Sequence, residues 1–360
     1  MSLTGALAAG KLKLLLAGVV VVSAGAGGAI VLSDDGGVAS DEERAGLLNS
    51  VPANVDYVVY GSTDVLADNT TAALYNGVVE RAAGPDADVP TYDEALQQAQ
   101  DEGNLSVDAF ETVLAFGTYP EANATSAYGG MLVESTLNES AFVDVFEDAG
   151  AELEATTYNG QPVYVNSSAA ADQDGYLGVL GNGLYVVGSQ AAVEDAIDTN
   201  AGEADHFSGD LRDALDDTEN GYYEFAFTVP EERMPSDTEN AMVETGPFNR
   251  IEVVSGSYFA DDDDTFGVRM TVTAANASDA ASINETSQQA LALAQFGVEE
   301  RALRQTLDNV TVAQDGRYVT FEYETTVTAF LDSVELLAEA ELAGETEEST
   351  MVNETSPAEA

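Results

Sequence analysis

The chain has 360 residues, of which 45% are hydrophobic, with 65 Asp and Glu, 11 Lys and Arg and no Cys. Every carboxylate lies beyond Leu32, and residues 33–360 hold nine Arg and no Lys, so this part carries a net charge of −56. Such a polyanion would be repelled by nucleic acid, which argues against that class of partner. The absence of cysteine excludes disulfides, thiolate nucleophiles and iron–sulfur ligation.

The size of the negative charge says something about the solvent. In ordinary buffer it would oppose compaction, but at 1 M salt the Debye length falls to about 3 Å and most of the repulsion is screened. The chain also has 15 Tyr and 13 Phe, which favours a folded protein over a disordered acidic one. The composition therefore indicates a folded protein of a halophile.

The N-terminal region has the charge pattern of a membrane segment. Residues 14–32 are uncharged and would span roughly 28 Å as a helix, close to the thickness of the hydrocarbon core. Lys11 and Lys13 precede this segment and acidic residues follow it from Asp34, so the positive-inside rule places 1–13 in the cytoplasm and the bulk of the chain outside the cell.

Two interpretations of this segment remain open. In the first, 14–32 is an uncleaved signal anchor, a single transmembrane helix that holds the chain in the lipid bilayer. In the second, it is a signal peptide cleaved near Ala26, and the chain is secreted. The apolar residues that continue past this site to Leu32 favour the anchor.

Half of the 18 asparagines lie in Asn-x-Ser/Thr sequons, the acceptor pattern of N-linked glycosylation. The alternative is that Asn, Ser and Thr simply cluster in turns. Together with the halophile composition, the sequons favour a glycosylated archaeal cell-surface protein. The candidate glycosylation sites are Asn69, Asn104, Asn123, Asn138, Asn166, Asn276, Asn284, Asn309 and Asn353.

The chain beyond the anchor divides into four parts. Residues 33–50 are predicted to form an acidic stalk, 51–204 a first lobe, 205–343 a second lobe and 344–360 a disordered acidic tail. In the first lobe we expect a strand at 55–62, helices at 69–81 and 91–102, strands at 110–119 and 128–135, a helix at 138–148, a hairpin over 152–165 that turns at Asn159-Gly160, a hairpin over 175–188 that turns at 181–183, and a helix at 190–198.

The second lobe is predicted to repeat this order. We expect a strand at 222–229, a hairpin of 250–260 and 265–274, a helix at 277–295, a hairpin of 309–312 and 318–326 around Asp315-Gly316, and a last helix at 327–342. The strands and helices do not alternate strictly, which favours antiparallel sheets. The expected fold class is α+β, with two similar lobes of antiparallel sheet and helices on one face, preceded by a single N-terminal transmembrane helix.

Three stretches carry a resemblance to a known group of proteins. They are VPANVDYVVYGSTDVL at 51–66, and YNGQPVYVN at 158–166 followed by GYLGVLGNGLYVVGSQAAVEDAID at 175–198. With the N-terminal anchor, this pattern resembles uncharacterised exported, N-terminally anchored cell-surface proteins of haloarchaea, and is similar to bacterial anchored proteins of unknown function. The resemblance implies localisation and architecture, with no catalytic signature to carry over.

The sequence offers little catalytic chemistry. His206 is the single histidine, and no G-x-S-x-G, P-loop or H-E-x-x-H motif is present. Asp261–Asp264 lacks the spacing of a calcium loop and is expected to be a solvated hairpin tip. The tyrosines fall mostly at alternating strand positions, where they are expected to pack on sheet faces. We therefore expect no catalytic, cofactor-binding or metal-binding residues.

These observations predict a non-enzymatic, N-glycosylated, membrane-anchored protein with a binding or assembly role at the cell surface. The expected partners are the bilayer, through 14–32, and other cell-envelope proteins or an apolar ligand. The alternatives are a secreted hydrolase that uses two carboxylates, and a carrier that holds an apolar ligand in a dry pocket.

Overall fold

The computed structural model describes residues 41–83, 89–103, 109–119, 128–167, 175–218, 221–230, 246–261, 264–297 and 301–336. The predicted anchor at 14–32 and the predicted tail at 344–360 lie outside these residues. The candidate glycosylation sites Asn104, Asn123 and Asn353 lie outside them as well.

The first half of the chain forms seven of the described strands. Its elements are α3 (Asp41–Leu48), β1 (Tyr57–Ser62), the 3₁₀ helix η1 (Thr63–Ala67), α4 (Asn69–Ala83), α5 (Tyr92–Gly103), β2 (Phe110–Gly117), β3 (Gly129–Ser135), α6 (Glu139–Asp148), β4 (Leu153–Tyr158), β5 (Gln161–Asn166), β6 (Tyr176–Gly181), β7 (Leu184–Gly188) and α7 (Gln190–Asn200). The predicted strands and helices of this half are confirmed to within a few residues at each end.

The second half repeats the same order with one hairpin fewer. Its elements are α8 (Asp210–Asp216), β8 (Tyr223–Thr228), the 3₁₀ helix η4 (Gly246–Arg250), β9 (Ile251–Asp261), β10 (Thr265–Ala274), α9 (Ala277–Gly297), α10 (Arg301–Asp308), β11 (Val310–Asp315) and β12 (Tyr318–Thr326). A last helix covers 327–336. In each half, three strands lead into a helix, and a later hairpin returns beside the third strand.

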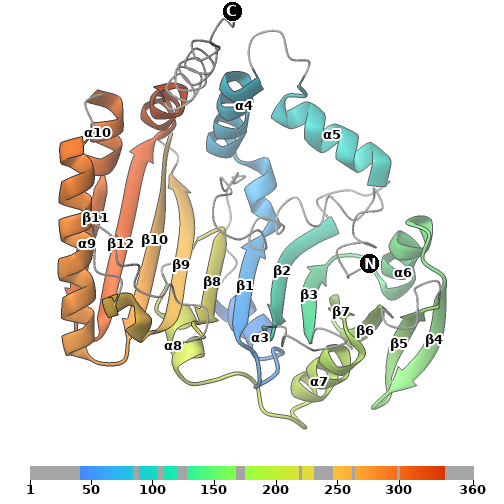
Figure 1. The fold of residues 1–360 in the computed structure, drawn as a ribbon. Helices are drawn as coiled ribbons and strands as arrows, with labels where there is room; N and C mark the ends of the chain where they lie inside the picture. The colour runs from blue at the N-terminus through green and yellow to red at the C-terminus, as the bar shows by residue number, and fades with distance from the viewer. Residues whose placement is uncertain are drawn as a thin grey trace, which may run out of the picture.

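All the described strands belong to one antiparallel sheet of 12 strands, in the order β11-β12-β10-β9-β8-β1-β2-β3-β7-β6-β5-β4 (Figure 1). The two halves meet where β1 pairs with β8, with Tyr57 opposite Phe227 and Gly61 opposite Tyr223. The expectation of two lobes is therefore corrected: the halves are similar in order, but their backbones hydrogen-bond into one continuous sheet.

Helices cover both faces of the sheet, which corrects the prediction of helices on one face. Along β2, Leu114 packs in a cluster with α3, α7 and α8, whereas its neighbour Val113 packs with α6. Tyr258 packs with α4 and the helix at 327–336, and Val254 packs with α9. Because successive side chains of a strand point to opposite faces, apolar residues on both sides need cover.

We call the side covered by α3, α7 and α8 the α3 face, and the side covered by α4, α6, α9 and the helix at 327–336 the α9 face. The α3 face carries the largest buried cluster, with Val58, Tyr60 and Phe116 from the sheet. In Figure 1, α9 and α10 lie beside the β11 edge, and α6 lies near the β4 edge.

The predicted stalk is too long, because residues 41–50 belong to the folded body. Residues 41–48 form α3, and Leu47, Leu48 and Val51 are buried in the cluster of the α3 face. The sequence analysis assigned this segment to the stalk because most of its residues are acidic or small, although it contains two adjacent leucines. These leucines and Arg44 dock the helix against the sheet.

The predicted hairpin turns are confirmed at their glycines. Asn159 and Gly160 both have positive φ, 47° and 80°, and Asn182 and Gly183 have 53° and 83°. Two-residue turns of this kind match the twist of the flanking strands and favour Asn followed by Gly. They set the register of β4 with β5 and of β6 with β7.

Candidate functional site

The sequon asparagines are the candidate functional residues that the sequence analysis singled out, and six of them are described. Asn69 begins α4, and Asn138 and Asn276 stand just before α6 and α9; all three are exposed. Asn166, Asn284 and Asn309 are half-buried. The structure thus spreads these residues over separate elements and does not gather them into one site.

Two of the sequons are also helix caps. The Oδ1 atom of Asn138 accepts a hydrogen bond from the backbone N–H of Ala141 at 3.2 Å. The Oδ1 atom of Asn276 accepts from the N–H groups of Ser278 and Asp279, each at 3.0 Å. Asparagine is favoured at this position because its side chain satisfies backbone donors that the helix leaves free. These sites therefore have a structural role whether or not a sugar is attached.

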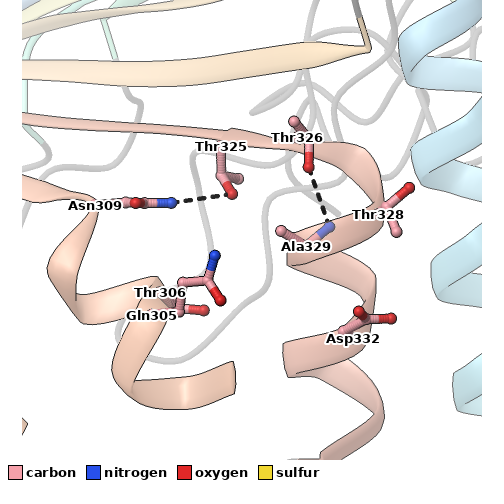
Figure 2. Close-up of a pocket in the computed structure, with 8 residues that line it drawn as sticks. All are labelled: Gln305, Thr306, Asn309, Thr325, Thr326, Thr328, Ala329 and Asp332. Atoms are coloured by element: carbon pink, nitrogen blue, oxygen red, sulfur yellow. Dashed lines mark hydrogen bonds between the residues drawn. The ribbon is translucent and has the colours of Figure 1, made fainter. Parts of the chain in front are cut away.

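Asn309 lies at the wall of a polar pocket of about 200 Å³, drawn in Figure 2. Its Nδ2 donates to Thr325 Oγ1 at 3.2 Å, and Thr326 Oγ1 accepts from the N–H of Ala329 at 3.3 Å. The pocket lies between α10 and the helix at 327–336. It is lined by Gln305, Thr306, Asn309, Thr325, Thr326, Thr328, Ala329 and Asp332.

The lining of this pocket matches neither of the two alternative functions. A glycosidase-type mechanism needs two carboxyl groups that flank the substrate, and Asp332 is the only acid among these eight residues. A carrier of an apolar ligand needs a mostly hydrophobic lining, whereas here hydroxyl and amide groups dominate.

Buried carboxylates are a second place to look for chemistry, because active sites often bury acids to shift their pKa. Among the described residues, three acids are buried, and each has a structural partner. Asp68 accepts from the N–H groups of Thr70 and Thr71 at the start of α4. Asp279 pairs with Arg250 at 2.5 Å. The third is Glu224, whose side chain is fully buried.

Glu224 forms the most buried ion pair of the described structure. Its Oε2 accepts from Arg44 Nε at 2.7 Å and also contacts Arg44 Nη2, which donates to the backbone oxygen of Leu215 at 2.7 Å. Burial raises the pKa of Glu224, and the adjacent guanidinium works against this rise. The pair joins α3 to the central strand β8.

The sequence analysis missed this pair, although a signal for it was present. Glu224 is the one charged residue in the apolar strand YYEFAFTV at 222–229. A lone carboxylate in a buried strand requires a partner, and few arginines are available to supply one. The sequence could therefore have indicated the pair, but not which arginine it uses.

Tyrosine hydroxyls donate hydrogen bonds to carboxylates at several positions near the surface. Tyr164 donates to Glu139 at 2.6 Å, and Tyr158 donates to Asp198 at 2.8 Å. These hydrogen bonds raise the pKa of Tyr158 and of Tyr164 to about 12, because ionisation would place two negative charges together. In the absence of lysine, tyrosine is the donor that satisfies these acids.

The remaining candidates offer no reactive arrangement. His206 is exposed and forms an isolated backbone bridge with Pro52. Asp261 and Asp264 flank the tip of the β9–β10 hairpin, where Asp264 has a φ of 59°. Within the described ranges, no group of three or more His, Asp or Glu could hold a metal ion.

The surface of α9 carries two exposed apolar side chains. Leu293 and Phe296 are 56% and 90% exposed on α9, and single exposed apolar side chains are common on soluble proteins. None of the helices in the described part of the chain has the length and apolarity that crossing a bilayer requires.

No protein-family model matches this chain, and neither a curated protein nor a solved structure matches it.

Proposed function

We propose that this chain is a non-enzymatic, N-glycosylated cell-surface protein of a halophilic archaeon. Residues 14–32 anchor it in the cell membrane by a single transmembrane helix, and the sheet body carries a binding or assembly role outside the cell. The observation that carries the proposal is the reversal of charge across 14–32. Two lysines stand before this uncharged segment, and residues 33–360, which follow it, carry a net charge of −56.

The distribution of carboxylates over the folded body supports the halophile part of this proposal. The chain has 65 acids, and of those described only Asp68, Glu224 and Asp279 are buried. The other acids whose side-chain burial the structure describes are at least partly exposed to solvent. A surface of hydrated carboxylates is expected where salt screens their mutual repulsion.

The accessibility of the sequons supports the glycoprotein part. Asn69, Asn138 and Asn276 are exposed, as N-linked acceptors must be. The absence of catalytic motifs from the sequence, and the structural partners of the three buried acids, favour a binding or assembly role over catalysis.

Intact-mass analysis of the protein purified from its native cells tests this proposal. We expect a mass above that of the polypeptide, from attached glycans, and an N-terminus that retains 14–32. A chain that begins near Gly27 would replace the anchor by a secreted form. Protease added to intact cells should digest the body, and a body that remains protected until the cells are lysed would contradict the surface location.

A further inference from the structure

The described sequons share one side of the sheet. Asn69 begins α4, Asn138 caps α6, Asn276 stands just before α9 and Asn284 lies within α9. These three helices pack on the α9 face, since Leu74 of α4, Phe142 of α6 and Ile283 of α9 belong to its clusters.

The two remaining described sequons lie on the same side. Tyr164 packs with α6 in a cluster of the α9 face, and Asn166 is two residues further along β5, so both point to that face. Asn309 donates to Thr325, which lies opposite Phe266 in the register of β10 with β12. Phe266 packs in a cluster of the α9 face with Leu74 and Leu331.

The α3 face also has exposed asparagines. Asn49 follows α3 and Asn200 ends α7, and both are exposed. However, Asn49 is followed by Ser50-Val51 and Asn200 by Ala201-Gly202, so neither has Ser or Thr at the third position. What distinguishes the two faces is the complete sequon and not the availability of exposed asparagine.

The contacts of the sequon asparagines are compatible with a sugar. Caps use Oδ1, whereas N-glycosylation joins Nδ2 to the anomeric carbon of a sugar donated by a phosphate-activated lipid-linked oligosaccharide. The lipid phosphate leaves, and Nδ2 loses one proton and keeps the other. The retained N–H can still donate from Asn309 to Thr325 and from Asn276 to Asp279.

We infer that the glycans on the described sequons form a one-sided coat over the α9 face, and that none of them covers the α3 face with α3, α7 and α8. This inference rests on the proposed surface location and glycosylation. It specifies the face from which these sugars project and the face that they leave accessible to other macromolecules. The binding or assembly role is thereby restricted to the α3 face.

Single-cysteine variants test the inference. Because the chain has no cysteine of its own, the introduced residue is the one position in it that a maleimide labels. Ala191 on α7 and Ala281 on α9 are both exposed helical alanines, one on each face. Ala281 lies between the sequons Asn276 and Asn284. The variants Ala191→Cys and Ala281→Cys, made in the native host, are treated on intact cells with a small membrane-impermeant maleimide and with a large maleimide–polyethylene glycol.

The expected result is that the small reagent labels both variants, whereas the large reagent labels Ala191→Cys and fails to label Ala281→Cys. Adding Ser278→Ala and Thr286→Ala, which remove the two nearby sequons while keeping both asparagines, should restore labelling of Ala281→Cys by the large reagent. Glycopeptide mapping should find sugars at Asn69, Asn138, Asn276 or Asn284.

Two outcomes would separate this inference from the proposed function. If the large reagent labels both variants equally, or if these four sites carry no glycan, the one-sided coat is wrong while the surface location stands. If neither variant reacts with the small reagent until the cells are lysed, the surface location itself is wrong.

Discussion

At the scale of single residues, the least expected feature is a buried charge pair, because almost all the other carboxylates of described burial are at least partly exposed. Arg44 and Glu224 are removed from water, and two such charges hold together only when their geometry and additional hydrogen bonds compensate for lost hydration. Thr218 Oγ1 at 3.2 Å and the N–H of Gly221 at 3.3 Å provide those additional bonds to Glu224.

A double-mutant cycle measures how strongly this pair couples. Arg44→Met alone should lower the free energy of unfolding by about 3–5 kcal/mol, because it leaves the buried Glu224 carboxylate without its cation. Glu224→Met alone should cost less, because Arg44 keeps Asp216 at 3.7 Å and the backbone oxygen of Leu215. The double variant should lose much less than the sum of the single losses. Glu335→Gln, at the partly exposed pair with Arg81, is the control and should cost no more than about 1 kcal/mol. Additive losses in denaturant unfolding would refute the coupling.

The hydroxyl of Tyr164 gives a prediction about alkaline pH. The folded-state pKa of about 12 lies above the value near 10 of an unfolded chain. The stabilisation from the Tyr164–Glu139 bond is therefore complete below pH 10 and disappears as pH rises through 12. In an ultraviolet titration, the difference between the wild type and Tyr164→Phe should have its midpoint near 12. Glu139→Gln should move this midpoint down, and an unchanged midpoint would exclude the carboxylate as the cause.

At the scale of elements, close packing between helices depends on one glycine. A Cβ placed on Gly77 of α4 would lie 2.2 Å from Leu331 Cδ1, so Leu331, which is buried, would have to move. In α3, by contrast, a Cβ on Gly46 meets nothing within 4 Å. The two glycines are thus matched helical positions with opposite surroundings.

Alanine at these two positions should have opposite effects. Gly46→Ala should raise the free energy of unfolding by about 0.5–1 kcal/mol, because alanine has the higher helix propensity. Gly77→Ala should lower it by about 1–2 kcal/mol, because overpacking outweighs that gain. Thermal melting monitored by circular dichroism compares the two variants. Equal shifts would show that Leu331 adapts without cost.

The docking of α3 predicts where the folded body begins. A chain that starts at Asp41 should retain the stability of the full chain, whereas one that starts at Val51 loses Leu47 and Leu48, each worth about 1.5–3 kcal/mol of burial, and leaves Glu224 unpaired. The shorter chain should therefore melt at a clearly lower temperature or fail to fold. Equal melting temperatures of the two chains would show that residues 41–50 belong to the stalk and not to the folded body.

At the scale of the whole molecule, most elements could be predicted from sequence because their signals are local. The turn signal Asn159-Gly160 predicted the hairpin over 152–165, and the alternation of apolar and polar residues in 110–119 and 128–135 indicated another. The joining of the halves could not be predicted, because the pairing of Tyr57 with Phe227 depends on residues far apart in the chain. Helices α3 and α8 were missed because their acidic, short sequences look like surface linkers. The sequons were found as a pattern, and only the packing of the helices on the sheet, together with the strand register, showed that the described ones share a face.

The same acidic surface determines how the whole molecule should respond to salt. Residues 33–360 carry −56, and the described ion pairs, such as Arg212–Asp216 and Arg269–Glu322, engage few of the carboxylates. The folded state brings the unpaired charges closer together than the unfolded state does, so repulsion opposes folding until salt screens it. The melting temperature should therefore rise between 0.1 M and 2 M KCl. Sucrose, which favours compact states without screening charge, is the control and should not replace KCl. A body that melts no lower in 0.1 M than in 2 M KCl would show that its carboxylates are not an adaptation to brine.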